Sequence, residues 1–158
     1  MAYNRKEQSF LKDLQNDEKN CAEKYRQASE CCCDPTLKGL FDQIQQEEQG
    51  HYDTVTQMLN CGRAPREKPA APCKKGRGGC TCSQADLRSK ADTAGKARDA
   101  YLLADLLATE KYISAGYNTA VFEFTDEASR QTLSGIQQQE QHHGKQLADY
   151  MQANGMYC

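Results

Sequence analysis

The chain has 158 residues, of which 38% are hydrophobic and 27% charged, with a formal net charge of −2 and a mean hydropathy of −0.88. This length suits one domain with a buried core, and the near-neutral charge excludes the strongly basic class of nucleic-acid-binding proteins. No stretch approaches the roughly 20 apolar residues that cross a membrane, and residues 1–8 lack the apolar segment of a signal peptide, so we expect synthesis and initial folding in the cytosol.

Two helices are predicted over about residues 5–60, forming a first helical hairpin. The first helix covers about 5–32, and Asp34-Pro35 then supplies an N-cap and a proline at the first position of the second helix, which ends at Gly62. Apolar residues recur at spacings of three and four, as on the buried face of a helix. These stripes consist of Leu11, Leu14, Cys21, Tyr25 and Ala28, followed by Leu37, Phe41, Ile44, Val55 and Met58.

Residues 61–82 are predicted to be a long crossover loop. This stretch holds Pro65, Pro69 and Pro72, four glycines and four cysteines, a composition typical of loops. It is also basic but lacks an aromatic residue for stacking on bases, which favours contact with an acidic partner over nucleic-acid recognition.

A second hairpin is predicted over about residues 83–154. Ser83-Gln-Ala-Asp86 has the form of a capping box, and we expect the third helix to run from there to about Phe124. Asp126 is the expected N-cap of the fourth helix, which ends near Asn154-Gly155. The two stripes are Leu103, Leu106, Ile113, Tyr117 and Val121, followed by Leu133, Ile136, Leu147 and Tyr150. The fold class is therefore predicted to be all-α, with one domain over residues 1–158 built as a four-helix bundle from two hairpins.

The two hairpins are an internal repeat, and one polar pattern occurs in both. Glu18 precedes Glu48-Gln-Gly-His51 by 30 residues, and Glu110 precedes Glu140-Gln-His-His143 by 30 residues, so all the equivalent positions are 92 apart. Each of these glutamates and histidines falls on an apolar stripe and is expected to face the core. Either Glu-x-x-His alone would be ordinary for a helix surface, but six positions in register on four core-facing stripes are not.

Six core-facing polar residues of these types indicate a metal site. Four carboxylates brought together in a core would repel one another, and two divalent cations would balance their charge. A Glu and a His at positions i and i+3 lie on one helical face and can share an ion, while the lone glutamates bridge or cap it. We therefore predict that two ions per chain, iron or manganese, are bound by Glu18, Glu48, His51, Glu110, Glu140 and His143.

Four further residues lie near this pattern. Tyr25 and Tyr117 each follow a lone glutamate by seven residues, and their hydroxyl groups are candidates for hydrogen bonds to a ligand carboxylate or for one-electron donation, with a plain core role as the alternative. His142 and Glu47 fall off the core stripes, and we expect both to lie at the surface.

Nine cysteines are unusual for a chain without a secretion signal. Their spacing lacks the paired Cys-x-x-Cys of zinc ribbons, so disulfides within or between chains are the leading interpretation. A second metal site, thiol donors to the metal centre and unreactive thiols remain open. The candidates for disulfides or cross-links are Cys31, Cys32, Cys33, Cys61, Cys73, Cys80, Cys82 and Cys158.

The second hairpin resembles the coat F family of bacterial spore coat proteins, through Tyr101-Leu-Leu-Ala-Asp-Leu-Leu-Ala-Thr-Glu-Lys-Tyr112, Tyr117-Asn-Thr-Ala and Asn154-Gly-Met-Tyr157. The resemblance implies a ferritin-like fold, synthesis in the mother-cell cytoplasm and deposition in the spore coat, in contact with copies of the chain and with other coat proteins. It would also explain the cysteines, since coat proteins rich in cysteine become cross-linked.

The ligand pattern separately resembles that of ferritin-like dimetal proteins, among them bacterioferritin, rubrerythrin and manganese catalase. In bacterioferritin a tyrosine also follows the first glutamate by seven residues, as Tyr25 follows Glu18. This chain lacks the rubredoxin module of rubrerythrin and the additional domains of manganese catalase. Two hypotheses follow. The first is a metal-binding structural protein of the coat that is cross-linked by disulfides, with consumption of peroxide or dioxygen as an additional activity left open. The second is a soluble dimetal oxidoreductase without a structural role.

Overall fold

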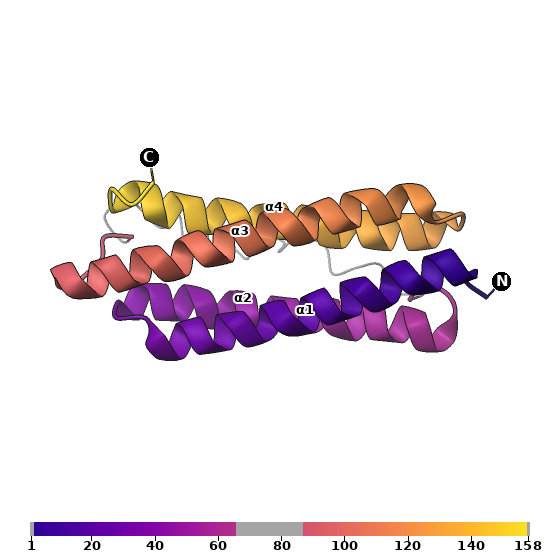
Figure 1. The fold of residues 1–158 in the computed structure, drawn as a ribbon, viewed down its shortest axis with the longest axis horizontal. Coiled ribbons are helices and arrows are strands. Elements are labelled where there is room, and N and C mark those ends of the chain that lie inside the picture. The colour runs from indigo at the N-terminus through magenta and orange to yellow at the C-terminus, as the bar shows by residue number, and fades with distance from the viewer. Residues whose placement is uncertain (1, 66–86, 158) are drawn as a thin grey trace, which may run out of the picture.

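The computed structural model describes residues 2–65 and 87–157. These residues form four helices, α1 (Arg5–Cys31), α2 (Pro35–Cys61), α3 (Thr93–Glu123) and α4 (Glu127–Ala153), and no strand. Helices α1 and α2 pair as one antiparallel hairpin and α3 and α4 as another, and the two hairpins lie against each other as two layers (Figure 1). The all-α, four-helix prediction is confirmed for this part of the chain.

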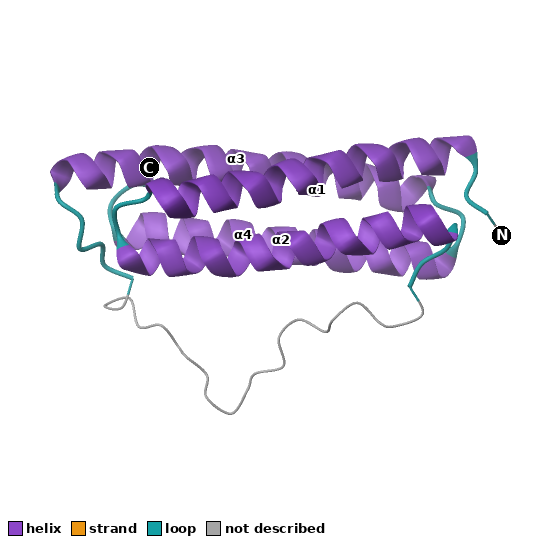
Figure 2. Cartoon of the chain, turned by 90° about the horizontal axis from the view of Figure 1, so that it is seen from below, coloured by secondary structure: helices purple, strands orange, loops and turns teal. Residues whose placement is uncertain are grey.

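The connection between the hairpins leads from one end of the bundle to the other. Helix α2 ends near the N-terminus of the chain, whereas α3 begins at the opposite end, beside the turn between α1 and α2 (Figures 1 and 2). Helices α1 and α3 are therefore antiparallel neighbours, and α2 and α4 complete the bundle behind them. Within the connection, residues 66–86 lie outside the described part of the chain.

Most helix ends fall where the sequence places them. Asn4 caps α1 in a capping box with Glu7, and Asp34 caps α2, with its carboxylate accepting from the Leu37 backbone N–H and Pro35 in the first turn. The residue that ends α2 is Gly62, whose φ of 63° is in the left-handed region that glycine adopts without strain. Asp126 caps α4 through the Ser129 N–H.

The predicted start of the third helix is wrong. Residues 87–92 are not helical, and α3 begins only at Thr93, where the Asp92 side chain accepts from the Gly95 N–H. The preceding segment is instead held by the capping residues of other helices: Asn154, which follows α4, accepts from the Ser89 N–H, and Asp34, which precedes α2, accepts from the Lys90 N–H. Tertiary hydrogen bonds thus replace the helical bonds that the local pattern favours. The proposed capping box itself, Ser83 to Asp86, lies outside the described residues.

Each hairpin has one buried carboxylate that accepts hydrogen bonds from the turn of the other hairpin. Glu7 on α1 accepts from the backbone N–H and the hydroxyl of Thr125, in the turn between α3 and α4. Asp99 on α3 accepts from the backbone N–H groups of Cys33 and Asp34, in the turn between α1 and α2. Glu7 and Asp99 are 92 residues apart, so these clamps belong to the repeat, and our sequence comparison did not identify them.

The four predicted stripes form the core, with Val121 only partly buried. Helix α3 differs from α1 on its outer face, which carries Tyr101, Tyr112 and Phe122 at 73, 68 and 76% exposure. The equivalent residues of α1 are polar: Ser9, Asn20 and Glu30. We call Tyr101, Tyr112 and Phe122 the α3 aromatic stripe. None of the described helices is both long and apolar enough to span a bilayer.

Candidate metal centre

The fold brings the six predicted ligands together at mid-height in the bundle. One glutamate comes from α1, one from α3, and a Glu-x-x-His from each of α2 and α4. All six side chains are buried, none more than 4% exposed: Glu18, Glu48, His51, Glu110, Glu140 and His143. Polar groups of this kind are rarely buried without a partner, so their burial needs an electrostatic explanation.

The ligand atoms form two overlapping groups. Glu18 and His51 belong to one and Glu110 and His143 to the other, while Glu48 and Glu140 belong to both; within each group the candidate donor atoms all lie within 4.8 Å of one another. The sequence left open which glutamates are shared. The geometry assigns that position to the glutamates of the two Glu-x-x-His motifs and leaves Glu18 and Glu110 on one group each.

Both histidines turn Nδ1 into the centre and meet the opposite hairpin. His51 Nδ1 lies 2.8 Å from an oxygen of Glu140, and 3.4 Å from one of Glu48 on its own helix. His143 Nδ1 lies 2.8 Å from an oxygen of Glu48, and 3.9 Å from one of Glu140. Each motif therefore faces the carboxylate of its counterpart, which makes the two groups nearly symmetric.

The other ring nitrogens are held by a second equivalent pair of residues. His51 Nε2 lies 2.6 Å from the Gln139 amide oxygen, and His143 Nε2 lies 2.7 Å from a Glu47 carboxylate oxygen. The expectation that Glu47 is a solvated surface residue is therefore wrong, because its side chain reaches across to α4 and is only partly exposed. An acceptor at Nε2 fixes the orientation of an imidazole and leaves Nδ1 directed at the centre. His142 is exposed, as predicted.

Tyr25 and Tyr117 also connect the two hairpins. The Tyr25 hydroxyl donates to Glu110, and the Tyr117 hydroxyl donates to Glu18. Each tyrosine thus meets the lone glutamate of the other half, and not the glutamate seven residues before it. Both hydroxyls are buried, and burial raises the pKa of each well above the usual value, so both tyrosines remain protonated donors.

Burial opposes charge throughout this cluster. Burial raises the pKa of Glu18 to about 8 and that of Glu110 to about 7, and it raises the pKa of Glu140 well above its usual range. Glu48 is the exception: although burial acts to raise its pKa, the hydrogen bond from His143 and the nearby charge of His51 outweigh burial and lower it. The metal-free centre therefore holds protons that bound cations would displace.

The donor atoms at the centre fit a pair of divalent cations. Of the seven buried side-chain polar atoms without a hydrogen-bond partner in the described part of the chain, six belong to these residues: Glu18 Oε2, Glu48 Oε2, His51 Nδ1, Glu110 Oε2, and both oxygens of Glu140. A buried polar atom without a partner loses its hydration energy uncompensated. Carboxylate oxygens with one imidazole per group are ligands that iron and manganese accept.

The described cysteines lie at both ends of the bundle, apart from the buried Cys21 on α1. Cys31 and Cys33 are exposed and Cys32 is partly buried beside the α1–α2 turn, whereas Cys61 is exposed at the opposite end. These five cysteines form no disulfide with one another. Cys73, Cys80, Cys82 and Cys158, which are also candidates for cross-links, lie outside the described residues.

Comparison with known proteins gives one match. Residues 98–157, which comprise nearly all of α3, all of α4 and the segment that follows it, match the family model of the Coat F domain. This match supports the coat F family of spore coat proteins and a location in the spore coat. It covers the second hairpin, the half that carries Glu110, Glu140 and His143. Neither the curated proteins nor the solved structures give a match.

Proposed function

We propose that this chain is a ferritin-like protein of the spore coat that binds two divalent cations, iron or manganese, in the core of its bundle. One observation carries the proposal: two overlapping groups of buried carboxylate and imidazole side chains, six of whose atoms have no hydrogen-bond partner. Glu18 and His51 would hold one ion, Glu110 and His143 the other, and Glu48 and Glu140 both. Four carboxylates would balance the charge of two divalent ions.

Two such ions, when bound, can exchange two electrons with peroxide or dioxygen. The residues of the chain would then have distinct tasks. Tyr25 and Tyr117 orient the two lone carboxylates, Glu47 and Gln139 orient the two imidazoles, and the apolar stripes above and below exclude water. This arrangement serves an oxidoreductase and also a bundle that ions merely stabilise, because geometry of this kind does not fix the reaction.

Purified protein would distinguish the two roles. We expect about two iron or manganese ions per chain by elemental analysis, and loss of both in a Glu48→Ala, Glu140→Ala variant. Consumption of hydrogen peroxide by the metal-loaded wild type, and not by this variant, would support a peroxidase or catalase. Full metal content without turnover would leave the structural role, and a wild type that takes up no metal under anaerobic loading would overturn the proposal.

Metal affinity should rise with pH between about 6 and 8. Burial places the pKa of Glu110 at about 7 and that of Glu18 at about 8, so both carboxyls are protonated at the low end of this range. Cations must displace these protons, and for each proton released per ion the dissociation constant changes about tenfold per pH unit. Titration with Mn²⁺ at several pH values measures the slope. An affinity independent of pH would show that binding occurs elsewhere.

Removal of the Glu47 side chain should weaken metal binding from outside the ligand set. In Glu47→Ala, His143 Nε2 loses its acceptor at 2.7 Å, and we expect an affinity lower by about 10- to 100-fold for the ion on the His143 side. Glu47→Gln is the matched control, because glutamine already serves at the equivalent position, Gln139. Equal losses in both variants, measured by titration with Co²⁺, would mean that charge and not orientation matters.

We further propose that the chain assembles with other coat chains, starting with copies of itself. Tyr112 lies 11 residues after Tyr101 and 10 before Phe122, about three helical turns on either side. Two antiparallel copies of α3 would therefore place Tyr112 on Tyr112 and each Tyr101 beside a Phe122. Exposed thiols at both ends of the bundle, Cys31 and Cys33 opposite Cys61, would then join such units. Each disulfide would form as two thiols lose two electrons and two protons to an oxidant such as dioxygen.

Replacement of the α3 aromatic stripe should abolish association of the reduced protein. The variant Tyr101→Ser, Tyr112→Asn, Phe122→Glu installs the residues that α1 carries at the equivalent positions, so the helix itself tolerates them. We expect the wild type to dimerise by sedimentation equilibrium in reducing buffer and the variant to be monomeric with unchanged helicity. Non-reducing gels after oxidation test the cysteines separately, and monomer alone there would contradict cross-linking between chains.

A further inference from the structure

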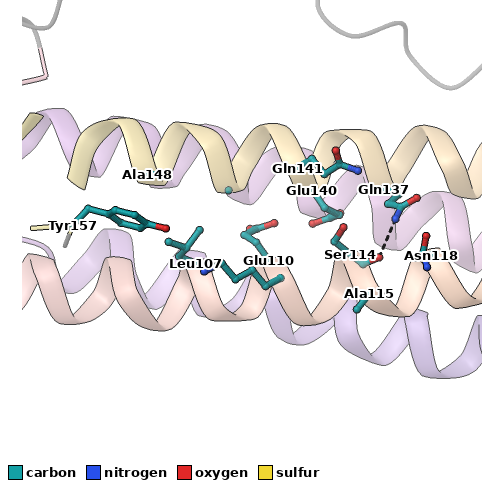
Figure 3. A pocket seen from close by; sticks show the side chains of 12 residues that line it. Leu107, Glu110, Ser114, Ala115, Asn118, Gln137, Glu140, Gln141, Ala148 and Tyr157 are labelled. Atoms are coloured by element: carbon teal, nitrogen blue, oxygen red, sulfur yellow. Dashed lines mark hydrogen bonds between the residues drawn. The ribbon is translucent and has the colours of Figure 1, made fainter. Parts of the chain in front are cut away.

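A pocket between α3 and α4 borders the candidate metal centre on one side of the bundle. Its volume is about 530 Å³, and its lining includes the ligand carboxylates Glu110 and Glu140. Both carboxylates lie between the two helices, and Ser114, Asn118 and Gln137 line the pocket beyond them (Figure 3). Polar side chains of the pocket thus stand beside two of the candidate ligands, whose carboxylates are themselves buried.

The internal repeat provides the corresponding face of the other hairpin for comparison. Four residues that line the pocket have larger counterparts 92 positions earlier, on α1 and α2. The pairs are Ala115 and Glu23, Asn118 and Arg26, Gly144 and Tyr52, and Ala148 and Thr56. The ligands beneath are the same on both faces, so the difference lies in what covers them.

The larger residues also bind one another on the α1–α2 face. Arg26 pairs with Glu23, with 2.7 Å between nitrogen and oxygen, and the Gln15 amide donates to the Thr56 hydroxyl at 2.7 Å, connecting α1 to α2. On the other face Leu107 and Ala148 stand at the positions of Gln15 and Thr56 and cannot form such a bond. The Gln15–Thr56 bond therefore joins α1 to α2, whereas the link between α3 and α4 at the pocket is the Gln137 amide, which donates to the Ser114 backbone carbonyl at 3.3 Å (Figure 3).

Gly144 is the residue that holds the pocket open next to a ligand. A Cβ atom built on Gly144 would lie 3.6 Å from Leu107 Cδ1 and 3.8 Å from Glu110 Cβ, which is ordinary contact. Alanine would therefore fit at this position, whereas a longer side chain would extend into the space above Glu110. Tyr52 is that longer side chain at the equivalent position of α2.

We propose that hydrated divalent cations enter the metal centre through the α3–α4 pocket, and that the α1–α2 face is closed by the larger residues of the first repeat. The inference rests on the proposed metal function. Ser114, Asn118 and Gln137 offer hydroxyl and amide oxygens that can replace waters of a hard cation on its way to Glu110 and Glu140. Lys111 at the edge is matched by Lys19 on the other face, so it does not distinguish the two.

The rate of metal loading tests the route without any enzymatic assay. Stopped-flow absorbance with Co²⁺ gives both the rate and the final number of ions. We expect Gly144→Tyr to load about tenfold or more slowly, because entry then requires a local opening, and to reach the same final content. Gly144→Ala should load within about twofold of the wild type, since its added methyl group fits. Tyr52→Gly should not slow loading, and it should restore the rate when combined with Gly144→Tyr.

A second variant tests the same route at the surface. Ala115→Glu, Asn118→Arg places the Glu23–Arg26 pair of the first repeat on exposed positions of α3, where folding is not at risk, and it should also slow loading. Wild-type rates in both Gly144→Tyr and this variant, with full Co²⁺ content, would overturn the route and leave the metal site in place. A wild type that binds no Co²⁺ would remove the site and the route together.

Discussion

Glu48→Gln alone should remove both metal ions from the protein, and Glu140→Gln alone should do the same. Each of these carboxylates belongs to both groups of candidate ligands, so its loss leaves neither ion with a complete set. Glutamine keeps the shape of glutamate and one oxygen, but it carries no charge and an amide is a far weaker ligand. Elemental analysis after loading should give close to zero ions per chain for either variant.

The lone glutamates are the matched comparison. Glu18 and Glu110 belong to one group each, so Glu18→Gln and Glu110→Gln should each lose one ion and retain the other. All four substitutions remove one buried carboxylate of similar exposure, which separates the sharing of a ligand from the loss of charge. If Glu48→Gln kept one ion while Glu18→Gln lost both, the assignment of shared and unshared ligands would be reversed.

The burial of the six candidate ligands could be predicted from the sequence, because helical periodicity and the repeat act within single helices. Glu18, for example, lies between Leu14 and Cys21 on one stripe, and a residue at that place must face the core. Capping residues were equally legible at Asp34, Gly62 and Asp126, where a short segment suffices to define the end of a helix.

Contacts between hairpins could not be predicted in this way. Tyr25 lies on the same stripe as Glu18, yet its partner is Glu110, because the relative height of α1 and α3 is set by packing and not by any local pattern. Glu47 falls off the stripe of α2, but the crossing of α2 and α4 brings it to His143. The late start of α3 has the same origin, since Asp34 and Asn154 reach the residues before it from other helices.

The internal repeat does contain a signal for the role of Glu47 and Gln139. Positions 47 and 139 are equivalent in the repeat, both immediately precede a shared glutamate, and both carry a side chain that can accept a hydrogen bond. Glu7 and Asp99 are likewise equivalent in the repeat and carry carboxylates that accept hydrogen bonds, with which they clamp opposite turns. Equivalent polar residues in the two halves thus include those that orient the histidines and those that bind the turns, in addition to the candidate ligands.

Removal of both metal ions should lower the stability of the wild-type protein strongly. With each ion at 1,000 times its dissociation constant, binding stabilises the folded state by about 4 kcal/mol per site, so about 8 kcal/mol for two. For a chain of this size that corresponds to a fall in Tm of roughly 15–30 °C when the ions are chelated. Calorimetry of the wild type with Mn²⁺ and with excess EDTA measures the difference.

In the double variant Glu48→Gln, Glu140→Gln, we expect no effect of metal on the Tm. It should show one Tm with and without Mn²⁺, because it binds no ion. Its Tm should also lie below that of the metal-free wild type, because Glu48→Gln removes the carboxylate whose charge His143 stabilises, whereas Glu140, whose pKa burial raises, gains little from neutralisation. A double variant more stable than the metal-free wild type would mean that the cost of burying the Glu48 charge exceeds the stabilisation from its hydrogen bond with His143.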